Sequence, residues 1–394
     1  MNAVDLQRSA APRVLIVLQP GGAWSRGILR GFMAAAHERG WTLLHYHPSV
    51  DLDWLMREFM PAAAVIGPEL PRESIARLTP TPIVSVAFDR SEHGIASVYP
   101  DDKSIAALAL DHLLATGLRQ VSTFRFDESP FAIARERAFV ERARAAGIRV
   151  AAGWGSDEAT SSRRDEDPAA MMAWLRDLPK PCGVFTISDS WGRTVARYAH
   201  MTGLRVPEEL ALIGADNDAL ECELVVPSLS SVMVPWRELG RNAARLVDLG
   251  LSGHAIAGQR LVLSPVAVMA RRSSDAIAIG DPLVAKAVRW IRQNSDRRLT
   301  VPIVVRAVGG GRQRLERRFR LVLDRTVHEE IRRTRVEMAR GLLESSPASL
   351  HEVAKRSGFT TAALLSKAFH RELGMPPGLY RRRVQRALES TVDE

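Results

Sequence analysis

The segment LHEVAKRSGFTTAALLSKAFHRELGMPPGLYR, Leu350–Arg381, has the pattern of two helices separated by a tight turn. Ser357-Gly358-Phe359 marks the turn. Four apolar residues then recur at helical spacing and predict a buried stripe, namely Leu364, Leu365, Ala368 and Phe369. Gly374 ends the second helix, and Pro376-Pro377 stops its continuation. The segment is therefore predicted to be a helix-turn-helix, whose second helix lies in the DNA major groove.

A weaker copy of this unit precedes it. The spacing Leu315-x-Arg317-x-Phe319 recurs fifty residues later as Leu365-x-Lys367-x-Phe369. The copy consists of a predicted first helix over 302–308, a turn at Gly309-Gly310-Gly311, and a second helix over Arg312–Leu323. Between the copies, residues 327–344 predict a long linking helix, and residues 283–294 predict an amphipathic helix before them.

The second unit resembles the signature of AraC-type regulators. The matching positions are Ala354, Gly358, Phe359, Leu365, Phe369, Gly374, Pro377, Tyr380 and Arg381. The resemblance implies that two recognition helices enter successive major grooves. The first unit departs from it, with glycines where a capping Ser is usual and Val305 where a small Ala is expected, which predicts a crowded helix crossing.

Candidate DNA contacts lie at the starts and along the outer faces of the two recognition helices. Arg312, Gln313 and Arg314 are placed to reach base edges, as are Thr360, Thr361 and Ala362 in the second unit. Arg317, Arg318 and Lys367 are better placed for phosphates, which position a protein without specifying sequence. The bland alternative is a helical hairpin whose arginines are merely solvated.

The charge distribution agrees with a polyanion-binding C-terminal part. The 394-residue chain has a net charge of +9, and from Pro282 onward Lys and Arg number 24 against 12 Asp and Glu. The first 281 residues hold 30 against 33 and have the balance of an ordinary soluble body. The chain has two cysteines, Cys182 and Cys222, and no long apolar run, so a reducing cytoplasm is expected, without membrane partner or signal peptide.

Strands and helices alternate through the first 270 residues. The predicted strands are 13–18, 41–47, 62–66, 83–87, 120–126, 183–187 and 211–214, and a period-two segment, 261–269, closes the body. The intervening segments 27–39, 104–116, 132–146, 171–178, 191–202 and 236–250 are predicted to be helices. The alternation, with continuous apolar strands, predicts doubly wound parallel sheets.

This order resembles the two-lobed module of LacI-type repressors and periplasmic binding proteins. The segments that carry the resemblance are HLLATGLRQV (112–121), ISDSWGRTVARYAHMTGLRVPEELALIGADND (187–218) and VPSLSSV (226–232). The predicted organisation is a tail (1–11), a two-lobed α/β ligand-sensing domain (12–270), a polar linker (271–281), an all-α domain with two helix-turn-helix motifs (282–386) and a tail (387–394).

A cleft between two such lobes binds small ligands at the carboxyl ends of the strands. Trp24, Ser25, Asp89, Asp189 and Asp216 follow predicted strands. The resemblance marks Asp189, Asp216 and Arg135, the last within RERAF, and Arg193 lies one turn beyond Asp189. Carboxylates, guanidinium groups and an aromatic face are what a sugar requires. The alternative for the aspartates is helix capping.

The segments DPLVAKAVRWIRQNS and LERRF extend the resemblance to XylR-like regulators of xylose operons. That likeness implies an aldopentose effector, double-stranded DNA as a partner, a homodimer and contact with RNA polymerase. Trp24 and Ser25 differ from the loop it implies, so the sugar stays open.

The sequence disfavours two other classes of protein, an enzyme and a transport binding protein. An enzyme on a doubly wound fold is disfavoured because the sequence lacks GxGxxG after the first strand, GxxxxGK[ST], GxSxG and HExxH. A transport binding protein is disfavoured by the basic C-terminal part. No catalytic residue, metal site or cofactor is expected.

Overall fold

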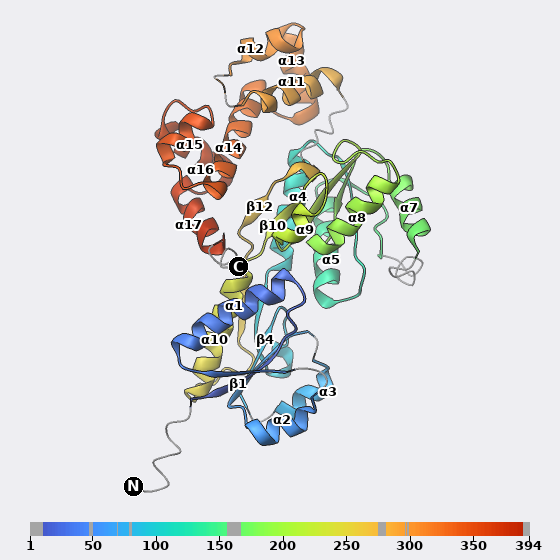
Figure 1. The fold of residues 1–394 in the computed structure, drawn as a ribbon. Coiled ribbons are helices and arrows are strands. Elements are labelled where there is room, and N and C mark those ends of the chain that lie inside the picture. The colour runs from blue at the N-terminus through green and yellow to red at the C-terminus, as the bar shows by residue number, and fades with distance from the viewer. Residues whose placement is uncertain are drawn as a thin grey trace.

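The structure is a computed structural model that describes residues 11–46, 50–68, 70–78, 81–155, 167–274, 281–295, 297 and 299–388. Two α/β lobes are followed by a domain of helices alone (Figure 1). The predicted α/β sensing part and all-α C-terminal part are therefore confirmed. Parts of several predicted segments lie outside the described residues. They are residues 1–10 and 389–394 of the two tails, His47 at the end of the second strand, and linker residues 275–280.

Lobe one has a six-stranded sheet in the order β11-β5-β4-β3-β1-β2, with every described pairing parallel. Its strands are β1 (Arg13–Val17), β2 (Thr42–His45), β3 (Ala63–Ile66), β4 (Ile83–Val86), β5 (Ala96–Pro100) and β11 (Arg260–Leu263). Its helices are α1 (Ala23–Glu38), α2 (Leu52–Phe59), α3 (Arg72–Ile75) and α10 (Trp236–Leu251), with short turns η2 (Ala76–Leu78) and η3 (Ser91–His93). The central strands are buried on both faces, as their apolar runs predict.

Lobe two repeats the plan in the order β12-β10-β9-β8-β6-β7. Its strands are β6 (Gln120–Thr123), β7 (Arg149–Val150), β8 (Cys182–Phe185), β9 (Leu210–Ala215), β10 (Ser230–Met233) and β12 (Ala267–Met269). Its helices are α4 (Asp102–Ala115), α5 (Pro130–Ala145), α7 (Pro168–Asp177), α8 (Asp189–Met201) and α9 (Ala219–Glu223), and the turn η4 (Arg272–Ser274) ends it. Strand β12 pairs antiparallel with β10, and the other pairings are parallel.

The chain passes between the lobes three times, before α4, before α10 and between β11 and β12. The expectation of one closing segment over 261–269 is therefore wrong, because β11 lies in lobe one and β12 in lobe two. Pro265 lies between the two strands and has no amide hydrogen for a ladder. Each lobe is thus assembled from segments that are distant in sequence.

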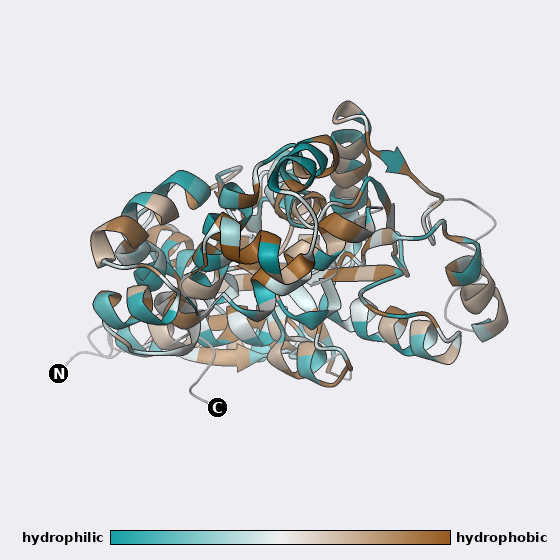
Figure 2. Ribbon diagram, turned by 90° about the horizontal axis from the view of Figure 1, so that it is seen from above, coloured by the Kyte–Doolittle hydropathy of each residue, from teal (hydrophilic) through white to brown (hydrophobic). Residues whose placement is uncertain are grey.

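Lobe one is completed by a close contact between α1 and α10. A Cβ built on Gly31 would lie 2.0 Å from the Arg237 carbonyl oxygen, and one on Gly240 would lie 2.0 Å from the Ile28 oxygen. Only glycine permits this backbone approach. Teal and brown residues alternate along the outer helices, as expected of helices with one buried face (Figure 2).

The helical domain contains α11 (Pro282–Gln293), α12 (Val301–Val308), α13 (Arg312–Leu323), α14 (Val327–Ser345), α15 (Leu350–Arg356), α16 (Ala362–Leu373) and α17 (Pro377–Leu388). Helix α14 joins the two helix-turn-helix units, as predicted (Figure 1). The first unit has its own apolar core around Phe319. The core of the second, around Phe369, continues into lobe two through Met233 and Ala267.

The first residues of the expected linker belong to lobe two. Ser273 and Ser274 are each 1% exposed. The Ser273 hydroxyl donates to the Leu212 carbonyl oxygen at 2.8 Å, and Arg271 Nη2 donates to Asn217 Oδ1 at 2.8 Å. Residues 271–274 are therefore anchored to the sensing domain rather than forming a free polar hinge.

Candidate effector cleft and DNA interface

A buried ionic cluster lies at the edge of lobe two that faces lobe one. Arg135, on α5, is 2% exposed. Its Nε donates to Asp102 Oδ1 at 2.8 Å, and its Nη1 donates to the Ile187 carbonyl oxygen at 3.0 Å. Asp216 Oδ1 lies 3.6 Å from the same Nη1. One guanidinium thus gathers the start of α4 and the ends of β8 and β9.

The backbone is strained where these strands end. Positive φ values occur at Ile187 (61°), Asp216 (107°) and Asn217 (55°) in lobe two, and at Ala87 (77°) in lobe one. Side chains disfavour this conformation, and such strain concentrates at binding sites that the surrounding structure fixes in place. The strained residues coincide with the carboxyl edges where the sequence predicts the ligand.

Burial controls ionisation in this cluster. It raises the pKa of Asp216 to about 7, against the attraction of Arg135, and Asp218 raises that pKa further. Burial likewise raises the pKa of Asp189 well above its usual range, and the Asp216 charge adds to the effect. For Arg135, burial opposes the charged form, but the carboxylates of Asp102 and Asp216 outweigh it and raise the pKa. The guanidinium stays charged while its carboxyl neighbours hold protons readily.

Two buried carboxylate oxygens lack a hydrogen bond from the described residues, although one of them, Asp216 Oδ1, lies within ion-pair distance of Arg135. Asp189 Oδ2 accepts a hydrogen bond from the Asp218 amide at 2.8 Å, which ties α8 to the loop after β9. Within the described residues, Oδ1 of Asp189 and Oδ1 of Asp216 have no hydrogen-bond partner. An unpaired buried acceptor costs about 1–3 kcal/mol, so these oxygens are suited to accept hydroxyl hydrogens from a ligand.

A cavity of 490 Å³ opens between the lobes beside this cluster. Asp89, His93, Tyr99 and Arg260 line it from lobe one, and Asp102 and Phe131 from the start of lobe two. Asp89 accepts a hydrogen bond from the Tyr99 hydroxyl at 3.0 Å and lies 2.6 Å from Arg260 Nη2. Although partial burial opposes it, hydrogen bonds from Ser91 and Tyr99 lower the pKa of Asp89, which stays ionised.

The predicted ligand residues lie in different surroundings. Arg135, Asp189 and Asp216 come together in the buried cluster, and Asp89 lines the cavity. Trp24 packs edge-on against Trp236, with ring centroids 6.2 Å apart, within lobe one. The remaining two, Ser25 and Arg193, make contacts of another kind.

Ser25 and Arg193 are engaged within the protein. Ser25 is fully buried, and its hydroxyl donates to the Gly22 carbonyl oxygen at 3.1 Å while accepting from the Gly22 amide. This is the capping role at the start of α1, so the prediction of Ser25 as a ligand contact is not supported. Arg193 forms an ion pair with Glu221 of α9.

Sequence reasoning missed Asp102 and Asn217, which belong to the site. Asp102 was overlooked because the strand before it, β5, was not predicted, so the residue was not recognised as following a strand end. Asn217 is next to Asp216 in GADND, and its Oδ1 accepts from Arg271. Asp102 could have been found from its position just before a predicted helix, where the chain crosses from lobe one to lobe two.

One ion pair spans the two lobes directly. Arg26 of α1 lies 3.6 Å from Asp218, which caps α9 of lobe two. Their side chains are 37% and 13% exposed, so the pair lies at the boundary with solvent. Its formation depends on how closely the lobes approach.

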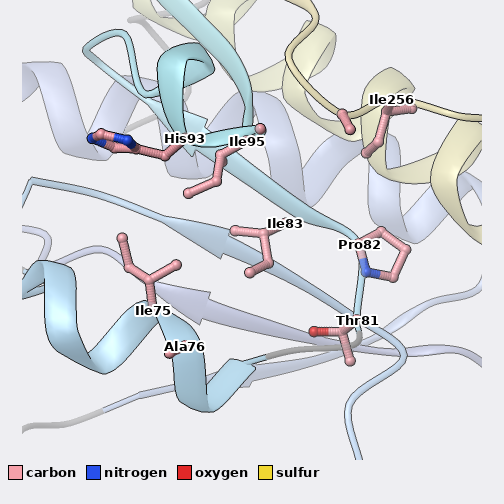
Figure 3. Close-up of a pocket in the computed structure, with 10 residues that line it drawn as sticks. Ile75, Ala76, Thr81, Pro82, Ile83, His93, Ile95 and Ile256 are labelled. Carbon is pink, nitrogen blue, oxygen red and sulfur yellow. The ribbon is translucent and has the colours of Figure 1, made fainter.

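A second cavity, of 420 Å³, lies in lobe one beside β4. Its lining is largely aliphatic, with Ile75, Ile83, Ile95 and Ile256 facing a common space (Figure 3). Such a lining offers few hydrogen bonds to a polyhydroxylated ligand. The cavity near Asp89 is the better sugar site.

The second helix-turn-helix has the predicted packing. Ala354, Leu365, Phe369 and Tyr380 are buried, and the Phe369 and Tyr380 rings meet edge-on with centroids 5.3 Å apart. Gly358 has φ +75°, and an added Cβ would lie 2.9 Å from the Ser295 carbonyl oxygen. The turn therefore requires glycine for its conformation and for its close packing.

Two residues of the second recognition helix differ from expectation. The Thr361 side chain caps α16 by accepting from the Leu364 amide at 3.2 Å, so its hydroxyl is already engaged. Leu364 is 51% exposed, so its predicted place in the buried stripe is wrong, because it lies one position off the Leu365–Phe369 face. With Lys367 it forms part of the exposed face of α16, and Thr360 is exposed just before the helix begins.

The first unit exposes the arginines that were predicted to bind DNA. Arg312, Gln313, Arg314 and Arg317 are exposed on α13. Gly309 and Gly310 have φ values of 77° and 102°, which explains the glycine-rich turn. Val305 is only partly buried against the core, so the helix crossing accommodates it without the expected crowding.

Arg318 is the exception on α13. It forms an ion pair with Asp281, whose carboxylate also caps α11 through the Leu283 and Val284 amides. The side chain thus holds α13 to the start of α11, and its predicted phosphate contact is not supported. The spacing of residues along a helix cannot predict an ion pair with a residue this distant in the sequence.

In the described part of the chain, no helix combines the length and apolar character needed to cross a bilayer.

Family comparison assigns residues 110–274 to the periplasmic binding protein-like domain. It assigns residues 304–383 to a helix-turn-helix domain. The two assignments coincide with the body of lobe two and with the two DNA-binding units.

Curated relatives match over about three quarters of their own length. The chain is 29% identical over 310 residues to the xylose operon regulatory protein of Escherichia coli K12, covering 76% of this chain and 78% of the relative. It is 28% identical over 284 residues to the protein of that name from Haemophilus influenzae, covering 71% and 73%. The solved structure of a xylose-binding transcription activator, xylR, matches the fold over 95% of this chain and 98% of that one, with a TM-score of 0.58 and 24% identity. The chain is therefore a helix-turn-helix transcriptional regulator, similar over most of its length to xylose operon regulators, in which a periplasmic-binding-protein-like domain precedes the DNA-binding domain.

Proposed function

We propose that the cleft between the lobes binds an aldopentose of the xylose class and that occupancy of the cleft controls binding of the C-terminal domain to DNA. The observation that carries the proposal is the cluster of Arg135, Asp102, Asp189 and Asp216, in which two buried carboxylate oxygens accept no hydrogen bond from the described residues. Vicinal hydroxyls satisfy carboxylates and a guanidinium together, and Phe131 and Tyr99 offer faces for the ring. The proposal assigns no catalytic step to the chain.

Coupling requires the sugar to bind one lobe arrangement better than another. Ligand contacts from both lobes favour the closed arrangement, and the Arg26–Asp218 pair adds to that preference. Because the core of the second helix-turn-helix continues into lobe two, a change in lobe two reaches α16 and α17 through packed side chains. We propose further that the protein acts in the cytoplasm as a homodimer, contacts RNA polymerase and activates sugar-catabolic genes.

The effector is tested by thermal-shift and calorimetric titration of the full chain with xylose, arabinose, ribose and glucose. One pentose is expected to stabilise the protein, and Asp216→Asn is expected to abolish the shift. Arg142→Met, which removes an exposed arginine of α5, is the matched control and keeps the response. Absence of any sugar response would refute the sugar assignment and leave DNA binding standing.

DNA binding is tested by fluorescence anisotropy on a mixed-sequence duplex over a range of salt concentrations. Arg317→Ala removes an exposed cation and is expected to lower the salt-dependence slope by about 1. Arg318→Ala, next to it, removes the partner of Asp281 and is expected to lower stability with little change in slope. Equal slope changes in both variants would contradict the assignment of Arg318.

A further inference from the structure

A third cavity, of 420 Å³, lies where lobe two meets the helical domain, apart from the cleft. Lobe two contributes α4 and the anchored segment 270–274 to its walls, and the helical domain contributes α11 and α14. Both domains therefore supply side chains to one cavity. A molecule bound there would contact the sensor and the DNA-binding domain at once.

The lining is strongly cationic. Five arginines, Arg271, Arg272, Arg292, Arg333 and Arg340, line the cavity with only two glutamates, Glu330 and Glu337. Glu330 is already paired with Arg325 at 2.6 Å, outside the lining, and Glu337 with Arg340 at 2.8 Å. The cavity thus has a surplus of three positive charges, and both of its carboxylates are engaged.

Arg333 is a cavity arginine without a direct ion pair in the described part of the chain. It is partly buried, and no carboxylate of the described residues lies within ion-pair distance of it. Burial lowers the pKa of its guanidinium and the neighbouring Arg325 lowers it further, while the charges of Glu330, Glu337 and Glu372 offset only part of this shift. Repulsion of this kind destabilises the junction unless an anion relieves it.

His112 shows how closely the cations converge. Its Nε2 lies 2.6 Å from the Ser274 hydroxyl in the wall of the cavity. Burial lowers the pKa of His112 to about 3, and Arg340, Arg292 and Arg333 each lower it further. The imidazole is therefore neutral at physiological pH and offers a hydrogen bond without adding charge.

We propose that this junction cavity binds a small phosphate-bearing solute. A guanidinium group pairs with phosphate oxygens through two parallel hydrogen bonds. Several guanidinium groups around one cavity therefore suit a doubly charged phosphate better than a singly charged carboxylate ligand. The hydroxyl of Thr334 is available to the polar part of such a solute. A volume of 420 Å³ falls in the range of about 300–1,000 Å³ typical of small-molecule sites, so a sugar phosphate fits as well as the free ion.

A ligand bound in the junction cavity would stabilise the arrangement in which α4 and α14 line the same space. A ligand that contacts both domains favours the state in which they are joined, by an amount set by its concentration and affinity. The site therefore provides a second input to DNA binding, chemically distinct from a neutral sugar in the cleft. It does not depend on the identity of the cleft ligand.

The test is isothermal titration of the full chain with inorganic phosphate and with ribose 5-phosphate, at constant ionic strength set by chloride, with ribose as the uncharged control. At least one phosphate compound is expected to bind. Binding of both identifies the phosphoryl group as the determinant, and binding of the ester alone identifies an organic phosphate. If neither compound binds, the proposal is wrong.

Variants locate the site. Arg333→Gln is expected to weaken phosphate binding by about tenfold or more, the cost of a lost charge-assisted hydrogen bond. Arg272→Gln, at an exposed position that does not support folding, is expected to weaken it several-fold, while exposed Arg144→Gln on α5 leaves it unchanged. If Arg314→Gln on α13 weakens binding as much as Arg333→Gln, the anion is held by the DNA-binding face and the proposal fails. If Arg333→Gln lowers the salt slope of DNA binding as Arg317→Ala does, the cavity faces DNA, which also overturns it.

Discussion

Arg135 Nε lies 2.8 Å from Asp102 Oδ1. This hydrogen bond connects α5 to the first residue of α4, where the chain enters lobe two. Removing one partner of a buried ion pair leaves an uncompensated charge, which costs about 3–5 kcal/mol. Arg135→Met is therefore expected to lower the free energy of unfolding by that amount in urea denaturation.

The matched control lies two residues along the same helix. Arg137 pairs with Glu141 on the surface, with a side chain 77% exposed, so Arg137→Met should change stability by less than about 0.5 kcal/mol. Similar losses in both variants would show that burial of Arg135 carries no special weight.

Asp216 makes stability fall as pH rises. Because burial raises the native pKa from 3.8 to about 7, the folded protein binds more protons than the unfolded chain between these values. The destabilisation is absent below about pH 4 and fully present above about pH 7, reaching at most about 4 kcal/mol.

Asp216→Asn removes this titration. Relative to the wild type, its free energy of unfolding should rise with pH through the window from about 4 to 7. Denaturation curves at several pH values, without sugar, measure the difference. Exposed Asp177→Asn is the control and should follow the wild-type profile; a parallel profile for Asp216→Asn would mean that Asp216 is ionised in the folded state.

Gly358 should not tolerate a side chain. Gly358→Ala would place Cβ at φ +75° and 2.9 Å from the Ser295 carbonyl oxygen, so we expect more than about 1 kcal/mol of destabilisation and weaker DNA binding. Gly341, in the middle of α14, has open space around its Cβ position, and Gly341→Ala should stabilise the helix by up to about 1 kcal/mol. Thermal unfolding distinguishes the two, and a neutral Gly358→Ala would contradict the packing described.

Thr361 is expected to act on DNA binding through the helix it caps. Thr361→Ala removes the acceptor for the Leu364 amide and should cost about 1 kcal/mol of stability, whereas Thr361→Ser keeps it. Anisotropy measured below the unfolding transition should then show near-equal DNA affinities for the two variants. A large affinity loss in Thr361→Ala alone, with unchanged stability, would instead assign the hydroxyl to a base.

The sequence predicted best where local chemistry determines structure. Helix α13 begins and ends at the predicted residues, Arg312 and Leu323, because glycines precede it and its apolar spacing is regular. The cluster of Arg135, Asp189 and Asp216 was predicted from strand ends and family resemblance. Strand β5 was missed because Ser97 and Pro100 leave its sequence, ASVYP, without a continuous apolar run, and Asp102 was missed with it.

Some features of the structure depend on partners distant in the chain. Arg318 has the helical position of a phosphate contact, yet it pairs with Asp281, 37 residues away. The junction cavity likewise joins residues of α4 with residues of α14 more than two hundred positions later. Periodicity and motif spacing contain no information about such encounters.

The discontinuous lobes impose an order on biosynthesis. Lobe one lacks α10 and β11 until the ribosome has translated all of α4 to β10, so its first five strands emerge with an open edge at β5 and an uncovered face. Lobe two also waits, for β12. The basic helices emerge last, and a nascent chain therefore completes its sensor before it can engage nucleic acid.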